Sequence, residues 1–225
     1  MKKYELTAEF IEKWGKKLFR IKALISFGSV EVGELGGYVE KEDNLAQDGN
    51  AWVYGNARVY GNARVCGDAE VYGNAEVCGN AWVCGNAWVY GNAWVYGNAE
   101  VYGDAEVYGD ARVCGDARVC GDAEVYGNAR VCGDAEVYGN ADYLLIGRIG
   151  SRFSFTTFFK NKDKGITVSC GCFLGTIAEF RAKVSDTHGN NKHAKIYNLA
   201  ADMAELQILG EEYFDKLNTN KSEPF

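Results

Sequence analysis

Proline, histidine and methionine are nearly absent from this chain of 225 residues: there is one proline, Pro224, and there are two residues each of histidine and methionine. No hydrophobic run reaches the roughly 20 residues that cross a membrane as a helix. The first residues, MKKYELTAEF, also lack the apolar stretch of a secretory signal peptide. We therefore expect a cytoplasmic protein without a membrane segment.

The charge is spread unevenly, although the total is −7. Residues 49–142 carry 5 basic and 13 acidic side chains, whereas residues 143–225 carry 11 and 9. Because an acidic middle part repels a polyanion, general binding to DNA or RNA is disfavoured.

Glycine is abundant, with 28 residues, and its spacing is regular. From Gly49 to Gly139 it recurs every six residues, sixteen times, in the unit G-[ND]-A-x-V-[YC]. A period of six does not fit an α-helix, but it fits a short strand followed by a corner. Alanine and valine then alternate with outward residues, as in a half-buried strand. Gly-Asn or Gly-Asp makes each corner, because these residues tolerate positive φ.

Three such sides make a triangular coil of eighteen residues, filled by alanine and valine. Parallel stacking of the coils at about 4.8 Å satisfies the backbone hydrogen bonds. The sequence thus predicts an all-β solenoid body over residues 49–149. An N-terminal cap, residues 1–48, precedes it, and an α+β extension with a strand and two helices, residues 150–225, follows it.

The repeat resembles the hexapeptide-repeat left-handed parallel β-helices, and more closely the YdcK-type β-solenoids found in phages and prophages. The closer resemblance extends into the N-terminal stretch, where Gly36-Gly37, Asn44-Leu45 and the sequence GNAWV at 49–53 look like that family's entry cap. The resemblance implies a left-handed coil, a phage or prophage origin and, for hexapeptide proteins, three-fold packing.

Six of the eight cysteines occupy the repeat position at which tyrosine is otherwise found: Cys66, Cys78, Cys84, Cys114, Cys120 and Cys132. The exchange with tyrosine marks a structural position. In a cytoplasmic protein we expect thiols there, and a disulfide framework is the alternative.

Outward residues eighteen apart form columns on the surface. One column is a tyrosine ladder, which stabilises a solenoid by stacking: Tyr54, Tyr72, Tyr90, Tyr108 and Tyr126. The outward tryptophans are more numerous than a soluble monomer usually exposes: Trp52, Trp82, Trp88 and Trp94. These nine residues are the candidate interface. We expect them to serve self-association, as a trimer by resemblance to the hexapeptide proteins.

The two ends depart from the repeat. In the N-terminal cap, ELTAEFIEKW predicts a short helix and LFRIKALISF a strand. After residue 149 we expect a basic, aromatic connector over 150–164, a strand over 166–173 and a helix that opens at the capping box of Thr176 and Glu179. A second helix is predicted for 191–217. Its apolar stripe, expected to be core or a contact between subunits, consists of Ile196, Leu199, Met203, Leu206 and Leu209.

The connector is the best candidate for contact with a small molecule, because cationic and aromatic side chains together suit phosphate binding and base stacking. The alternative is a solvated loop whose phenylalanines pack beneath the last coil. The candidate ligand-binding residues in this region are Arg148, Arg152, Phe153, Phe155, Lys160, Lys162 and Lys164.

The sequence contains few residues that would support an enzymatic activity. Many proteins with the hexapeptide fold are acyltransferases that use a histidine base, yet residues 49–142 contain no histidine and no loop interrupts the hexads. We assign no catalytic residue and expect no cofactor. A zinc site could draw on Cys170, Cys172, His188 and His193, but their spacing is a loose match. A buried thiol and surface histidines are the simpler interpretation.

We therefore expect a non-enzymatic, oligomeric binding protein, encoded by a phage or prophage if the resemblance holds. It would occupy a host factor or sequester a small anionic, nucleotide-like ligand, with counter-defence as its role. The alternatives are a trimeric acyltransferase and a purely structural spacer, because a fold alone does not imply a function.

Overall fold

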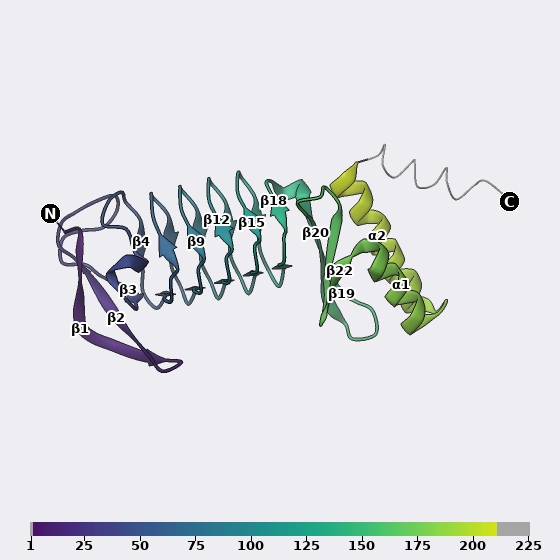
Figure 1. The fold of residues 1–225 in the computed structure, drawn as a ribbon, viewed down its shortest axis with the longest axis horizontal. Coiled ribbons are helices and arrows are strands. Elements are labelled where there is room, and N and C mark those ends of the chain that lie inside the picture. Colours follow the sequence, from purple (N-terminus) through teal and green to yellow (C-terminus); the bar gives the residue numbers. More distant parts are fainter. Residues whose placement is uncertain (1, 211–225) are drawn as a thin grey trace.

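The computed structural model describes residues 2–210, which form an elongated rod (Figure 1). A twisted N-terminal hairpin stands at one end, a stack of short strands forms the middle, and a sheet with two helices closes the other end. The repeat therefore runs along the rod, and the non-repetitive segments lie at its two ends.

The middle of the rod consists of strands of two residues, one for every six residues of sequence. Strands eighteen residues apart pair in parallel register, so that Trp88 pairs with both Glu70 and Glu106. Three parallel sheets result, one for each side of the coil. The strands of the described repeat are β4 Trp52–Val53, β5 Arg58–Val59, β6 Arg64–Val65, β7 Glu70–Val71, β8 Glu76–Val77, β9 Trp82–Val83, β10 Trp88–Val89, β11 Trp94–Val95, β12 Glu100–Val101, β13 Glu106–Val107, β14 Arg112–Val113, β15 Arg118–Val119, β16 Glu124–Val125, β17 Arg130–Val131 and β18 Glu136–Val137.

The alanine and valine of every hexad fill the interior of the coil. From Ala51 to Val137 none of them is more than 1% exposed, and together they form one continuous core. The backbone groups beside them bond to the next coil, as when the Tyr90 N–H donates to the Val107 carbonyl at 2.9 Å. The predicted solenoid of three-sided, eighteen-residue coils is confirmed.

Each corner combines a glycine at positive φ with an asparagine or aspartate. Gly97 has φ +77°, and a Cβ atom there would lie 2.9 Å from the backbone nitrogen of Gly115 in the next coil. Beside it runs a ladder in which the amide of Asn80 donates to Asn98 at 3.0 Å and that of Asn98 donates to Asp116 at 2.8 Å. An aspartate only accepts, so it can end such a ladder.

The N-terminal cap contains a β-hairpin where the sequence ELTAEFIEKW predicted a helix. β1 (Tyr4–Lys13) pairs antiparallel with β2 (Lys16–Ala23), and β2 pairs with β3 (Leu35–Val39). β3 runs parallel to β5 and extends one side of the solenoid, and a 3-10 helix, η1 (Glu42–Asn44), completes the cap. The helix prediction was wrong because apolar and polar residues alternate along β1, which is the period of a strand.

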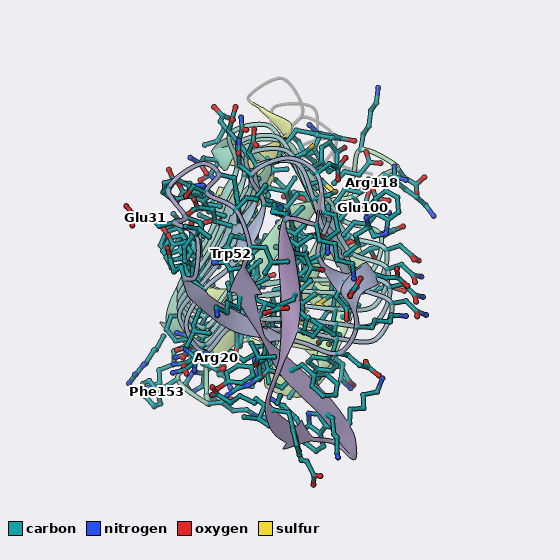
Figure 2. All side chains as sticks on the ribbon, turned by 90° about the vertical axis from the view of Figure 1, so that its left-hand side faces the viewer. Arg20, Glu31, Trp52, Glu100, Arg118 and Phe153 are labelled. Carbon is teal, nitrogen blue, oxygen red and sulfur yellow. A yellow bond between two sulfur atoms is a disulfide. The ribbon has the colours of Figure 1, made fainter. Side chains whose placement is uncertain are left out.

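Trp52 is completely buried, so its prediction as an outward interface residue was wrong. Its ring packs edge-on against Tyr4 and Phe27 of the cap, with centroids 6.0 Å and 5.3 Å apart. Figure 2, which looks along the rod from its N-terminal end, shows Trp52 inside the ribbon. The side of this first coil that carries Trp52 therefore faces the cap and not water.

A second sheet covers the last coil of the solenoid. After a 3-10 helix, η2 (Asn140–Asp142), the antiparallel strands are β19 (Tyr143–Ile149), β20 (Ser154–Lys160), β21 (Ile166–Cys170) and β22 (Phe173–Thr176). In β20, Phe159 packs on the solenoid core and Phe158 packs on the opposite side. Residues 143–149, predicted to belong to the solenoid body, thus pair in this sheet. The predicted connector contains β20, in which the four successive residues from Thr156 to Phe159 are all buried because both faces of the strand are covered.

Two helices lie on the side of this sheet away from the solenoid (Figure 1). α1 (Ile177–His188) opens with the predicted capping box: the Glu179 N–H donates to the Thr176 hydroxyl, and the Thr176 N–H donates to the Glu179 carboxylate at 2.8 Å. α2 (Lys192–Leu209) confirms the second helix up to Leu209, and the predicted residues 211–217 lie outside the described chain. Neither helix is long and apolar enough to span a membrane.

The structure contains two disulfides, which corrects the expectation of thiols at four positions. They link cysteines eighteen residues apart in adjacent coils, with Cα atoms 4.7 Å and 4.5 Å apart: Cys66–Cys84 and Cys114–Cys132. Cys78 and Cys120 stay free, because tyrosines occupy the same position in the coils above and below them. The eighteen-residue spacing of these cysteines indicates the pairs, whereas the expected reducing compartment argues against disulfides.

Each disulfide is expected to stabilise the solenoid, since it closes a loop of eighteen residues in the unfolded chain. Replacing both Cys66 and Cys84 with serine should lower the free energy of unfolding by about 3 kcal/mol under oxidising conditions. Denaturant unfolding with and without a reductant measures this. The control is Cys78→Ser, which removes a free thiol and should change the stability much less. Equal losses in the two variants would contradict the prediction.

Candidate ligand-binding site

Two arginines stand side by side near the C-terminal end of the solenoid. Arg112 of β14 pairs in register with Arg130 of β17. Neither has a carboxylate within ion-pair distance in the part of the chain that the structure describes. By contrast, Arg118 lies between Glu100 and Glu136, at 3.5 Å and 3.7 Å. Like charges directly opposite each other in a sheet repel, so the pairing of the two arginines is itself unfavourable.

The two arginines line a groove between the solenoid and the C-terminal sheet, with a volume of about 320 Å³. The Arg130 guanidinium donates to the Gly171 carbonyl at 3.3 Å, and that of Arg112 lies 5.5 Å from the Trp94 ring. The groove is lined by Asp110, Arg112, Asn128, Arg130, Ser154, Phe155, Thr157, Ser169 and Gly171. Its one carboxylate, Asp110, accepts a hydrogen bond from Asn92 at 3.0 Å.

A second, mostly apolar cavity of about 190 Å³ adjoins the groove and shares Ser154 and Gly171 with it. It lies between the sheet and the helices. Aromatic rings form much of its wall: Phe173, Phe180 and Tyr197. Arg152 and Lys183 add two cations to its lining, and a Cβ atom on Gly171 would lie 3.7 Å from the Arg152 guanidinium. Lys183 also pairs with Asp186 at 3.4 Å. The groove and the cavity together bring four cations to one junction.

The phenol of Tyr197 is a neutral polar group in this cavity. Burial raises its pKa, and the neighbouring Cys170 thiol raises it further. Cys170 also bonds with the Thr156 hydroxyl, at 3.2 Å between Sγ and Oγ1. The Tyr197 hydroxyl therefore keeps its proton at neutral pH and can donate a hydrogen bond to a bound molecule.

The structure brings only part of the predicted ligand-binding set to this junction. Arg152 lines the apolar cavity and Phe155 lines the groove. Phe153 is 72% exposed and points away from the body of the molecule (Figure 2), and Arg148 and Lys164 are also exposed. The remaining two lysines form ion pairs: Lys160 with Asp142 at 2.9 Å and Lys162 with Asp134 at 3.4 Å.

Arg112 and Arg130 were missed at the sequence level, although a signal for them exists. They follow each other in one column, at the eighteen-residue spacing, with no acidic residue between them. The other adjacent charges of the described columns include pairs of opposite sign, such as Arg58 with Glu76. The like-charged pair Glu106 and Glu124 differs, because each carboxylate accepts a hydrogen bond from a tyrosine hydroxyl. The two arginines have no carboxylate within ion-pair distance among the described residues, which makes them candidates for an anion site.

Only some of the four candidate zinc ligands lie close together. Cys170, Cys172 and His188 line the apolar cavity, and the ring of His193 lies 5.8 Å from that of His188. Among residues 2–210, no three histidine, cysteine, aspartate or glutamate side chains are arranged to hold a metal ion.

The tyrosines of the candidate interface stack on one another along one side of the solenoid. The rings of Tyr72, Tyr90 and Tyr108 stack at 4.7 Å and 4.9 Å, and Tyr126 continues the stack at 5.5 Å. Tyr54 lies in the same column, and its hydroxyl bonds with Ser29 of the cap at 3.0 Å.

The tryptophans of one coil point in three directions, because Trp82, Trp88 and Trp94 belong to three different sheets. Trp82 and Trp88 are 54% and 43% exposed, whereas Trp94 is partly covered by Lys13 and Arg112. No single flat partner surface can contact all three.

The fold and the junction define a β-solenoid protein of three parallel sheets, whose last coil is covered by a sheet-and-helix unit with a cationic groove between them. A comparison with protein families matches the YdcK β-solenoid repeat at residues 51–67 and 81–97, so the chain contains repeats of that kind. A comparison with curated proteins found no match. The matched stretches lie within the repeat, so this similarity concerns the solenoid and not the groove.

Proposed function

We propose that this protein binds a small anionic ligand at the junction of the solenoid and the C-terminal sheet, and that it acts by binding without catalysis. The observation that carries the proposal is the pair of adjacent, unmatched arginines, Arg112 and Arg130, in a groove. An anion between them relieves their mutual repulsion. Guanidinium groups also suit phosphate, because they bind two of its oxygens at once.

The shape of the junction favours a ligand that carries both an anionic group and a ring. The groove offers arginines and polar donors to the anionic group, while the adjoining cavity offers Phe173, Phe180 and Tyr197 to the ring. The two spaces adjoin, because Ser154 and Gly171 line both, and we propose that one molecule places its anionic group in the groove and its ring in the cavity. A nucleotide has this composition, with a base that packs on aromatic side chains.

The biological role that we propose is sequestration of a nucleotide signal, as a phage counter-defence protein. This part rests on the resemblance to phage-borne solenoids and on the acidic repeat, which repels long nucleic acids while the groove attracts a small anion. Three-fold self-association remains a prediction from the resemblance to the hexapeptide proteins, and it would use the exposed Trp82 and Trp88. A mass of three chains in solution would favour it over the two-chain assembly proposed below.

Removal of the arginine pair is expected to abolish tight binding. In Arg112→Ala combined with Arg130→Ala, the dissociation constant for a bound nucleotide should rise at least about 100-fold, because each lost charged hydrogen bond costs about 1.5–3 kcal/mol. Isothermal titration calorimetry with phosphate, pyrophosphate, AMP, ADP and a cyclic dinucleotide measures this. Denaturation of the purified protein, followed by mass spectrometry of the released small molecules, tests for a ligand that stayed bound during purification.

The matched control is Arg64→Ala, because Arg64 is an exposed arginine on another sheet of the same solenoid. It changes the net charge but leaves the groove intact. An equal loss in this variant would mean that the effect comes from overall charge. Equal affinity for ADP and pyrophosphate would show that the aromatic cavity does not bind the ring of the ligand. If no anion of the panel binds and none is released, the proposal fails.

A further inference from the structure

The outward face of α2 carries a row of large apolar side chains that nothing covers within residues 2–210. They are 39% to 63% exposed: Ile196, Leu199, Met203 and Leu206. The inward face, which is rich in alanine, packs on the sheet and on α1. Of the stripe predicted from the sequence as core or as a contact between subunits, these four residues are not core, whereas Leu209 packs against the core of the sheet and helices.

The orientation of α2 is fixed by a network of ion pairs with α1. The Arg181 guanidinium donates to Asp202 at 2.8 Å and to the buried Glu205 at 2.7 Å. Rotation of the helix that buried the apolar stripe would break these bonds and expose Glu205 together with the alanine face. The stripe thus remains outward in this fold.

We propose that this face docks against the same face of a second copy of the chain, with the two α2 helices antiparallel. The stripe has steps of three, four and three residues, which is the spacing of a coiled-coil seam. It is also symmetric about position 201. A two-fold axis at that point places Ile196 opposite Leu206 of the second copy and Leu199 opposite Met203 of the second copy.

The charges at the two ends of α2 fit the antiparallel arrangement. Lys192 and Lys195 stand in the first turn, which contains no acidic residue, and cations there oppose the helix dipole. The last turn contains no basic residue, so its partial negative charge is unmatched in the described chain. In an antiparallel pair, the lysines of each copy lie beside the negative end of the other helix.

The position of α2 leaves room for such a contact. Both helices lie at the end of the rod, on the side of the sheet away from the solenoid (Figure 1). Two rods can therefore join end to end, with their solenoids pointing apart, and the two-fold contact closes on itself. Four apolar side chains per copy form a small interface, so we expect a dissociation constant on the order of micromolar.

Light scattering and sedimentation over a range of protein concentrations test the proposal. The wild-type chain should pass from the mass of one chain to that of two as its concentration rises through the micromolar range. Leu199→Glu combined with Met203→Glu should raise the dissociation constant at least about 100-fold and leave the circular dichroism and the melting temperature unchanged. The control Ala182→Glu, at an exposed position on α1, should still form dimers.

The direction of pairing is tested by crosslinking in a Cys172→Ser background, which removes the exposed native thiol. A Leu199→Cys chain mixed with a Met203→Cys chain should form a disulfide-linked dimer of one copy of each, and either chain alone should form much less. A dominant Leu199→Cys homodimer would exclude the antiparallel pairing. A single-chain mass at every concentration, or a larger oligomer that survives the two glutamates, would overturn the proposal.

Discussion

Replacement of Gly97 with alanine is expected to lower the free energy of unfolding by about 3–4 kcal/mol. The left-handed conformation at φ +77° costs an alanine about 1–2 kcal/mol. In addition, its Cβ atom would lie 2.9 Å from the Gly115 nitrogen and 3.0 Å from the Gly115 oxygen, both of them backbone atoms of the next coil. Overpacking of this kind costs about 1–3 kcal/mol, because the stacked coils must move apart.

The chain supplies its own control for this prediction. Gly55 has φ +56°, and a Cβ atom there meets nothing within 4 Å. Gly55→Ala should therefore show only the conformational cost, about 1–2 kcal/mol. Denaturant unfolding of both variants separates the two contributions. Equal losses of unfolding free energy in the two variants would show that contact with the next coil adds no cost to a side chain at the corner.

Replacement of Glu76 with alanine is expected to cost about 3–5 kcal/mol and to release the tip of the N-terminal hairpin from the solenoid. The Glu76 carboxylate is buried and pairs with Lys13 at the tip of the hairpin and with Arg58 at 3.3 Å. It also accepts a hydrogen bond from the Tyr60 hydroxyl at 3.1 Å. Without Glu76, two cations and a phenol lose their common partner.

Hydrogen exchange in β1 and β2 reports the release directly, because β1 pairs with no strand other than β2 within the described chain. Faster exchange in these strands, with unchanged exchange in β12 to β18, is the expected pattern. Adding Lys13→Ala to the variant should restore part of the stability, since it removes one unpaired cation. Glu70→Ala is the matched control, because within the described residues the Glu70 side chain accepts one hydrogen bond, from the Tyr54 hydroxyl at 3.4 Å. If the hairpin in the Glu76 variant exchanges as slowly as in the wild type, the anchoring role is refuted.

The fold of the repeat could be predicted from sequence because residues eighteen positions apart must lie side by side in adjacent coils. The period of six predicts where the corners lie, and the alternation of alanine and valine predicts which side chains fill the interior. The eighteen-residue coil predicts which outward side chains form a column. The stacked rings of Tyr72, Tyr90 and Tyr108 follow from this spacing. The disulfides Cys66–Cys84 and Cys114–Cys132 obey it too, although the expectation of a reducing compartment led to the opposite prediction.

The candidate site could be predicted only in part, because its members come from segments without a common register. Arg152 and Phe155 were selected for their composition, and they do reach the junction. Arg112 and Arg130 belong to the repeat, and their role depends on a sheet that begins after the repeat has ended. Lys160 and Lys162 were predicted as ligand contacts, but each lies within reach of an aspartate near the end of the solenoid.

The sequence by itself determined which side chains point into the coil and which point out, because a strand residue and its neighbour eighteen positions away are held by the same backbone ladder. Only the tertiary structure decided what each outward side chain meets. Trp52 meets the cap, Arg112 and Arg130 meet the edge of a second sheet, and the apolar stripe of α2 meets no described part of its own chain. The reason is that these contacts join segments of different periodicity, whose relative placement depends on packing at the two ends of the rod.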